Sequence, residues 1–222
     1  MDKLTVITVC VNYADYLKQT IARTLEISDH YLIVTDKADD ETAKLADEHN
    51  VGLLRTNAFY DNGADFNKGL AIELAFAATH YSGWYLILDA DILLPKTPAT
   101  QELIFGNLGA YSIHDLYGMR RTQNGHRIND KELAGYFQLF HSESKFLATK
   151  PWYGTNWRHA GGCDSMFQAK YPPEHKQWLP GFVEHLGEPG VNWCGRTPEA
   201  QAKLKNYRIL RRQNKSYTAE QL

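Results

Sequence analysis

The unbroken apolar run from Leu4 to Val11, LTVITVCV, constrains the fold more than any other stretch of the chain. Its β-branched residues and its lack of polar alternation indicate a strand that is buried on both faces. Such strands belong to parallel sheets, in which helices connect consecutive strands and cover the sheet. The run therefore predicts an α/β fold.

Helical and strand-like patterns alternate through the rest of the first 94 residues. The predicted elements are a helix from about Asp15, a strand over Tyr31–Val34, a helix capped by Asp39 or Asp40, a strand over Val51–Leu54, a helix over Asp65–Tyr81 and a strand over Trp84–Leu88. This order predicts a parallel sheet that binds its ligand at the carboxyl ends of the strands.

Proline, glycine and charge divide the 222 residues unevenly, although the length predicts a single domain. All 8 prolines and 12 of the 16 glycines follow Leu94, so we expect a regular half over 1–94 and a loop-rich half over 95–195. In the loop-rich half we predict a hairpin at Asn124-Gly125, an edge strand over Gly135–His141 and a short helix over Cys163–Ala169. The remaining segment, 196–222, carries 7 basic and 2 acidic side chains.

The overall charge and the cysteines exclude several classes of protein. A net charge of −2 argues against general binding of polyanions, and three cysteines in 222 residues do not make a disulfide framework. Cys10 and its neighbours form an apolar run that is too short to span a bilayer, and no targeting segment is visible. We therefore expect a cytoplasmic protein.

Three carboxylates stand where predicted strands end. Asp36 follows the second strand, and Asp89 and Asp91 follow the strand over Trp84–Leu88. Two carboxylates one residue apart are suitable ligands for Mg²⁺ or Mn²⁺ shared with a diphosphate, whereas the alternative is that they cap the turn before Pro95.

Five segments, in their order along residues 3–195, resemble GT-A fold glycosyltransferases, in particular the inverting family 2 type. They are TVITVCVNYADYLKQTI, YLIVTDKADDETAKLA, NGADFNKGLAIELA, YLILDADILLP and AGGCDSMF. The resemblance implies a Rossmann-like GT-A fold with a central, mostly parallel sheet flanked by helices. It also implies a nucleotide-diphosphate sugar donor, UDP by preference, and Mn²⁺ or Mg²⁺ as cofactor.

The resemblance also assigns roles on the donor side. The donor-binding residues it implies are Val11, Asn12, Asp36, Asn67, Lys68 and Asp89, with Asp36 accepting a hydrogen bond from the base. The family commonly has an arginine directly before this asparagine, where the present chain has Phe66, so Lys68 is the alternative source of positive charge.

Further implied residues serve the metal ion and the acceptor. Asp91, with Asp89, would bind the cation, and His185 would complete the site, Glu184 being the competing choice. Asp164 would be the general base that deprotonates the acceptor hydroxyl, although the same carboxylate could cap the helix that follows it. The family usually has a second acidic residue after this aspartate, where this chain has Ser165.

The loop-rich half is expected to shape the acceptor side. Trp152 and Trp157 are candidates for exposed aromatic platforms, as is Tyr153, and Gly162 belongs to the acceptor-side element; the alternative is that the tryptophans fill the core. A basic helix over 203–215 would either contact an anionic acceptor or pack on the surface. The acceptor stays open: a glycan, a lipid carrier, a protein side chain or a hydroxymethylated base in DNA.

The resemblance, together with the carboxylates at the strand ends, implies a metal-dependent glycosyltransferase that acts on a hydroxyl acceptor with inversion. Two alternatives remain. A sugar-phosphate nucleotidyltransferase also places carboxylates at such strand ends, but it generally needs a glycine-rich basic loop after the first strand. A non-catalytic module that binds glycans or nucleic acids would have no need of Asp89, Asp91, Asp164 and His185 together.

Overall fold

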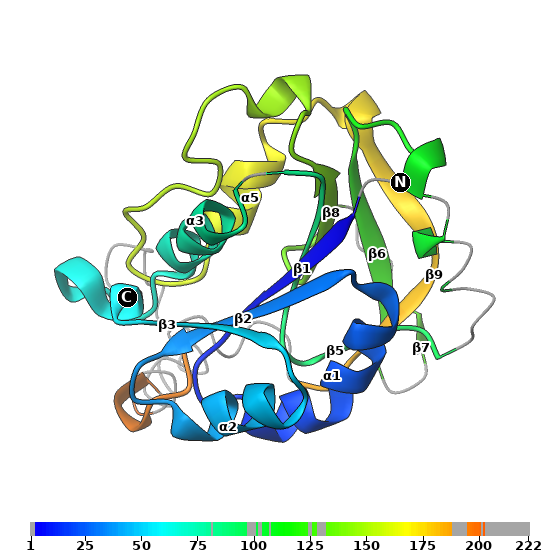
Figure 1. Cartoon of the computed structure of the whole chain (residues 1–222). Helices are drawn as coiled ribbons and strands as arrows, with labels where there is room; N and C mark the ends of the chain where they lie inside the picture. Colours follow the sequence, from blue (N-terminus) through cyan, green and yellow to red (C-terminus); the bar gives the residue numbers. More distant parts are fainter. Residues whose placement is uncertain are drawn as a thin grey trace, which may run out of the picture.

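A single mixed sheet forms the centre of the molecule in a computed structural model of the chain (Figure 1). The structure describes residues 3–80, 82–96, 101, 104–106, 108–123, 126–127, 132–187, 195–200 and 202. The strands are β1 (Leu4–Val9), β2 (His30–Asp36), β3 (Gly52–Thr56), β4 (Trp84–Leu88), β5 (Ile92–Leu93), β6 (Leu116–Gln123), β7 (His126–Arg127), β8 (Phe137–His141) and β9 (Lys176–His185). The helices are α1 (Ala14–Ile27), α2 (Asp40–Glu48), α3 (Lys68–Ala78) and α5 (Cys163–Gln168), with 3-10 turns η1 (Ala58–Gly63), η2 (Leu108–Ala110), η3 (Lys145–Leu147) and η4 (Pro173–His175).

The sheet joins a parallel half to a mixed half. Its order is β3-β2-β1-β4-β8-β6-β9-β5, with β7 paired to β6. The first four strands are parallel, as the alternating pattern predicted. β8 is antiparallel to both β4 and β6, and β9 is parallel to β6 and antiparallel to β5. The α/β architecture predicted from the sequence is therefore confirmed.

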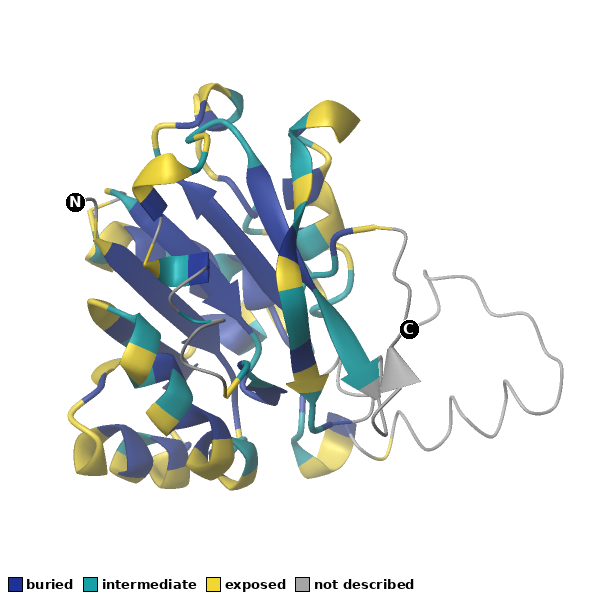
Figure 2. Ribbon diagram, turned by 90° about the vertical axis from the view of Figure 1, so that its right-hand side faces the viewer, coloured by how far each residue is buried: buried dark blue, intermediate teal, exposed yellow. Residues whose placement is uncertain are grey.

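Helices cover both faces of the sheet because alternate residues of the central strands point to opposite sides. On one face, Val6 and Leu86 pack in the same cluster as Leu17 of α1 and Leu45 of α2. On the other face, Ile7 and Ile87 share a cluster with α3 and α5. Figure 2 shows the central strands as buried and the helices below them as a mixture of buried and exposed residues.

Polar residues fix where two of the helices begin. Asp39 caps α2, as predicted, since its side chain accepts a hydrogen bond from the backbone of Thr42. Helix α3 begins at Lys68, three residues later than predicted, because Asn67 caps it and η1 occupies the chain up to Gly63. This start places Lys68 in the first turn of α3.

The prediction of an edge strand over Gly135–His141 is wrong. β8 lies between β4 and β6, and all five of its residues are buried. The polar residues that suggested alternation with solvent have partners inside the protein: the side chain of Gln138 accepts a hydrogen bond from the hydroxyl of Tyr153. Satisfied polar groups of this kind are tolerated in a core.

The predicted exposure of Trp152 and Tyr153 is also wrong. Trp152 is 1 % exposed, packs edge-on against Phe76 and donates a hydrogen bond to the carbonyl of Leu147. Tyr153 is fully buried and stacks on Phe167 with ring centroids 4.2 Å apart. Both rings belong to the core under the loops, which was the alternative considered for the tryptophans.

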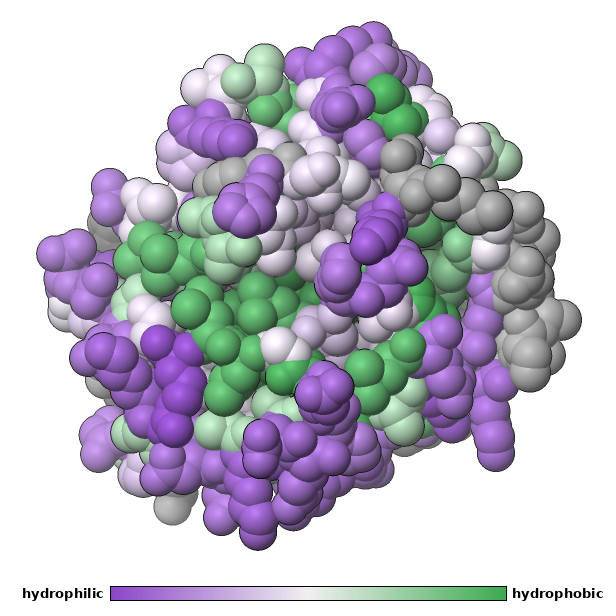
Figure 3. Space-filling model, viewed as in Figure 1, coloured by the Kyte–Doolittle hydropathy of each residue, from purple (hydrophilic) through white to green (hydrophobic). Residues whose placement is uncertain are grey.

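Some features of the chain lie at the margins of the sheet. β6 and β7 form the predicted antiparallel pair, with Gln123 opposite His126, while the turn residues themselves and the basic segment over 203–215 lie outside the described residues. β3 is an edge strand on which Leu53 is 36 % exposed. Figure 3 shows the same side of the molecule as Figure 1, with hydrophobic residues gathered in the middle of the surface that faces the viewer. None of the helices in the described ranges has the length and apolar character needed to cross a bilayer.

Candidate functional site

The carboxyl ends of β1, β2 and β4 bring the polar residues of the parallel half to one edge of the sheet. Asn12 follows β1, Asp36 ends β2, and Asp89 follows β4. Because these strands are parallel neighbours, their ends lie side by side. The structure therefore brings these candidate residues together at the edge where the sequence predicted a ligand site.

The side chain of Lys68 lies between two carboxylates. Its Nζ is 2.8 Å from Oδ1 of Asp89 and 3.3 Å from Oδ2 of Asp164. The lysine side chain is only 6 % exposed, compared with 33 % for Asp89 and 20 % for Asp164. A buried ammonium needs such partners, since an unpaired buried charge is strongly unfavourable. Lys68 thus connects the end of β4 to the first turn of α5.

Burial and charge shift the pKa values of this cluster in opposite directions. Burial acts to lower the pKa of Lys68, but Asp164 and Asp89 offset it, so the pKa stays well above its ordinary value. Burial raises the pKa of Asp164 to about 6, with Lys68 opposing the rise and Asp89 adding to it. A carboxyl group that titrates near neutral pH is suited to accept a proton from a substrate.

Asp164 is not the cap of α5. The cap position belongs to Gly162, and no side chain makes a capping hydrogen bond there. The other carboxylate oxygen of Asp164, Oδ1, is buried and has no hydrogen-bond partner in the described part of the chain. A buried acceptor without a donor is costly, so a hydroxyl group of a ligand would stabilise it.

The backbone beside Asp164 leaves no room for a side chain. A Cβ atom at Gly135 would collide with the carboxylate of Asp164. The next residue, Tyr136, accepts a hydrogen bond from the backbone N–H of Asp89 at 3.0 Å. The short segment before β8 therefore contacts the carboxylate of Asp164 and the backbone of Asp89.

Strand pairing brings His185 to Asp91 across 94 residues of sequence. His185 of β9 lies opposite Ile92 of β5, and Nε2 of the imidazole is 3.8 Å from Oδ1 of Asp91. Both side chains are 8 % exposed. Glu184, the competing choice, is exposed, as expected for the neighbouring residue of a strand.

The Asp91–His185 pair has the donor set for a divalent cation. Nδ1 of His185 lies 2.7 Å from the carbonyl oxygen of Gly187, which only accepts, so Nδ1 carries a hydrogen, and in the neutral imidazole Nε2 presents its lone pair to Asp91. Burial raises the pKa of Asp91, and the charge of Asp89 adds to the rise, whereas a protonated His185 would oppose it. Two acceptors facing each other with little water fit a metal ion.

No group of three or more His, Cys, Asp or Glu side chains is arranged to hold a metal within the described ranges. The pair could therefore supply two ligands, and a bound cation would take the others from water or from a substrate. Mg²⁺ sites with one or two carboxylates and substrate phosphates have this composition.

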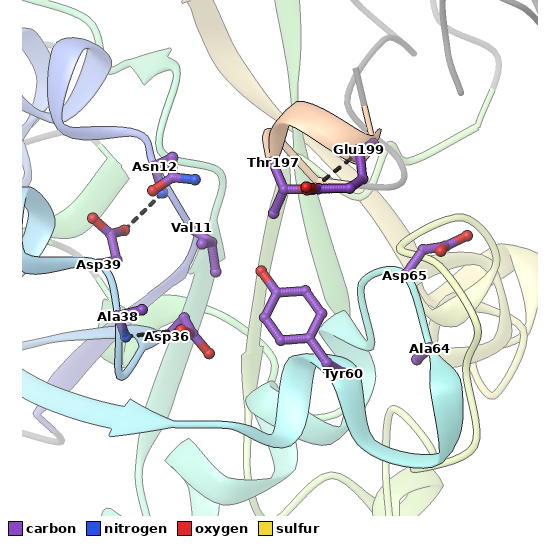
Figure 4. A pocket seen from close by; sticks show the side chains of 11 residues that line it. Val11, Asn12, Asp36, Ala38, Asp39, Tyr60, Ala64, Asp65, Thr197 and Glu199 are labelled. Atoms are coloured by element: carbon purple, nitrogen blue, oxygen red, sulfur yellow. Dashed lines mark hydrogen bonds between the residues drawn. The ribbon is translucent and has the colours of Figure 1, made fainter. Parts of the chain in front are cut away.

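A cavity of about 420 Å³ lies beside the ends of β1 and β2 (Figure 4). Its lining residues are Val11, Asn12, Asp36, Ala38, Asp39, Tyr60, Ala64, Asp65, Thr197, Glu199 and Ala200. Asp36 is 8 % exposed, and its Oδ1 accepts a hydrogen bond from the backbone of Ala38. Three of the residues implied for the donor side, Val11, Asn12 and Asp36, thus line one cavity.

Asn67 has contacts of a different kind from those expected. Its Oδ1 accepts from the backbone of Leu70, and its Nδ2 donates to the carbonyl of Thr155 at 2.7 Å. Both ends of the amide are therefore engaged in holding α3 and the loop around Thr155. These contacts give it a structural role.

Trp157 and Gly162 lie together between the first turns of α3 and α5. The half-buried indole donates from Nε1 to the carbonyl of Tyr153 and fits against three glycines. A Cβ atom at Gly69, Gly154 or Gly162 would press on the ring. The ring thus spans the starts of the two helices that carry Lys68 and Asp164.

Several residues at the site carry no local sequence signal. Gly135, Tyr60 and Glu199 reach it through turns and strand order, which the apolar pattern does not encode. Asp39 was identified as a helix cap, and the same residue also accepts hydrogen bonds from the backbone of Asn12 and from the hydroxyl of Thr35.

Comparison with solved structures reveals relatives of the same fold. Glucosyl-3-phosphoglycerate synthase from Mycobacterium tuberculosis, in complex with Mn²⁺, UDP and glucosyl-3-phosphoglycerate, is 15 % identical with a TM-score of 0.59; the match covers 98 % of this chain and 82 % of that chain. The same enzyme with Mn²⁺ and UDP-glucose is 16 % identical over 98 % of this chain and 81 % of that one, with a TM-score of 0.59. A search of curated proteins finds no match.

The family model described as glycosyl transferase family 2 matches residues 5–170, which include β1 except Leu4, β2 to β4, α3 and Asp164. The Rossmann-like GT-A fold is the one implied by the resemblance of the five sequence segments. The chain therefore belongs to glycosyl transferase family 2 and is a GT-A fold glycosyltransferase.

Proposed function

We propose that this glycosyltransferase moves a sugar from a UDP-linked donor to a hydroxyl group of an acceptor, with a divalent metal ion and with inversion at the anomeric carbon. The observation that carries the proposal is the contact of Lys68 with both Asp89 and Asp164. This contact joins Asp89, which follows β4, to Asp164, a carboxylate suited to deprotonate an acceptor. The Mn²⁺ and UDP-glucose bound in the mycobacterial structures support the choice of donor and metal.

The donor would lie along the edge formed by β1, β2 and β4. Its nucleoside would enter the cavity beside Asp36, whose carboxylate accepts a hydrogen bond from a ring N–H. Its diphosphate would then reach Asp91, which follows β4, and His185 at the end of β9. A Mn²⁺ or Mg²⁺ ion bound there would neutralise the negative charge of the departing diphosphate.

Asp164 would act on the acceptor. Its carboxylate accepts the proton of the attacking hydroxyl as the new glycosidic bond forms and the bond to the diphosphate breaks. Lys68 keeps this carboxylate ionised and holds Asp89 in place. A single displacement assisted by one base, with no nucleophile from the enzyme, inverts the anomeric carbon. Trp157 and Gly162, next to α5, would bound the acceptor side.

The role of Asp164 is tested by the substitution Asp164→Asn. We expect transfer to fall by about 100-fold or more, because positioned bases contribute about 10² to 10⁴ in rate. The dissociation constant for UDP-sugar, measured by calorimetry, should change little. Asp47→Asn, at an exposed position of α2, is the matched control and should retain activity. Near-normal turnover of Asp164→Asn would contradict the assignment.

The metal site is tested by the substitution Asp91→Asn, which replaces the charged carboxylate ligand with a neutral and weaker amide. Calorimetric titration of Mn²⁺ in the presence of UDP should show binding to the wild-type chain and at least about tenfold weaker binding to the variant. The reason is that even the loss of a hydrogen-bond partner of a metal ligand weakens metal affinity by about 10- to 100-fold. Equal Mn²⁺ affinity in both proteins would show that Asp91 is not a ligand.

The contact of Lys68 with Asp164 predicts how the transfer rate depends on pH. Asp164 accepts a proton only when ionised, so kcat/KM should fall as the pH drops through about 6, the pKa that burial imposes on this carboxyl group. Lys68 lowers that pKa, so Lys68→Met should move the acidic limb to higher pH, whereas Lys68→Arg should leave it close to its original position. An acidic limb at the same pH in Lys68→Met and in the wild type would contradict this role.

The importance of the position of the Asp164 carboxylate is tested by the substitution Gly135→Ala. The new methyl group would displace the carboxylate, and a shift of about 1 Å at a reacting group can cost about 100-fold in rate. Gly109→Ala is the matched control, because a Cβ atom at that position would have no neighbouring atom within 4 Å. Full transfer activity in Gly135→Ala would mean that the position of Asp164 is unimportant.

A further inference from the structure

One wall of the cavity near Asp36 comes from a part of the chain far from the catalytic carboxylates in sequence. Thr197, Glu199 and Ala200 line it, although they follow the residues matched by the family model, 5–170. Figure 4 shows Asp36 and Asp39 on one side of the cavity, Thr197 and Glu199 on another, and the ring of Tyr60 between them. The segment 195–200 therefore closes a cavity that the family region leaves open on this side.

An ion pair fastens this segment to α1. Nη1 and Nη2 of Arg196 lie 2.6 Å and 3.0 Å from the two carboxylate oxygens of Asp15, which is a bidentate contact. The guanidinium group also lies over two rings of the same region, 4.8 Å from the centroid of Tyr13 and 5.0 Å from that of Tyr16. The hydrogen bonds from Arg196 lower the pKa of Asp15, so the pair is charged at neutral pH.

One further contact holds the segment against the fold, and a hydrogen bond within the segment shapes it. Gly195 has a φ of +82° and packs so closely against the ring of Phe66 that a Cβ atom would lie 3.0 Å from it. Thr197 accepts a hydrogen bond from the backbone of Ala200, which is 4 % exposed. The segment is thus attached to the fold on both sides of the cavity.

The charges around the cavity select a particular part of a donor. Its described lining contains four acidic residues, Asp36, Asp39, Asp65 and Glu199, and no Lys, Arg or His. Such a lining repels phosphate and accepts hydrogen bonds from N–H and O–H groups. An uncharged nucleoside matches it, and the ring of Tyr60 offers a face on which a base can stack.

We propose that residues 195–200 form the outer wall of the nucleoside pocket and that the pair of Arg196 with Asp15 is the positioning element that holds Thr197 and Glu199 against the nucleoside. This inference rests on the proposed function, since it assumes a nucleotide-sugar donor. Arg196 acts through the wall it anchors. Its loss should therefore weaken nucleoside binding more than it lowers the turnover rate of the donor-bound enzyme.

The test compares Arg196→Gln, Asp15→Asn and the double variant with the wild-type chain. Dissociation constants for uridine and UDP are measured by ligand-observed NMR and calorimetry, beside adenosine, guanosine, cytidine and their diphosphates. We expect each variant to bind uridine and UDP about tenfold more weakly. This change corresponds to the loss of about one charged hydrogen bond between the wall, such as the carboxylate of Glu199, and the nucleoside. The double variant should bind no more weakly than either single variant, because both break the same contact.

Two further readouts separate positioning from general stability. At saturating donor, kcat should stay within about twofold of the wild type while KM for the donor rises, as for a residue that contributes uniform binding. The unfolding midpoint should change little, because exposed ion pairs contribute little to stability. Lys44→Gln, which breaks the exposed pair of Lys44 with Glu48 on α2, is the matched control and should leave all three quantities unchanged.

Three results would overturn the inference. Unchanged affinities in the variants would show that the wall is not needed, while leaving the proposed function intact. A loss seen with UDP and not with uridine would place Arg196 on the phosphates instead of on the wall. Failure of the wild-type chain to bind any of the nucleosides or diphosphates would overturn the proposed donor and this inference together.

Discussion

The buried ammonium group of Lys68 is the contact on which the arrangement of the site depends. It lies between Asp89, at the end of a strand of the parallel half, and Asp164, on the helix that follows the long loops of the second half. Like charges so close together would otherwise repel, and each would favour protonation. The lysine allows both carboxylates to be ionised together, and it thereby ties the two halves of the chain at one point.

Much of the regular half over 1–94 could be predicted from the sequence because its information is local. Apolar runs such as Leu4 to Val11 identify buried strands, and Asp39 marks the start of a helix. Parallel order then brings the strand ends together, so Asp36 and Asp89 lie at one edge without any further assumption. The pairing of Asp91 with His185 was inferred from the family resemblance, and β5 and β9 provide it in the structure.

The second half was harder to predict because its contacts are long-range. Gln138 looked like a solvent-facing residue, but its partner, Tyr153, becomes known only when the loop folds over β8. Trp152 in a polar stretch resembled a surface platform, and it fills the core instead. Gly135 and Arg196 act through close approach and through an ion pair with residues far away in sequence, and no periodic pattern encodes either.

The most direct measurement is the anomeric configuration of the product. The configuration of a transferred sugar is read from the proton NMR spectrum of the product. If the chain instead hydrolyses the donor slowly with water, the spectra are recorded before the free anomers equilibrate. If Lys68 keeps Asp164 as a base in a single displacement, the first-formed product has the configuration opposite to that of the donor. A product that retains the donor configuration would contradict this, because a single in-line displacement by the acceptor hydroxyl always inverts the anomeric carbon.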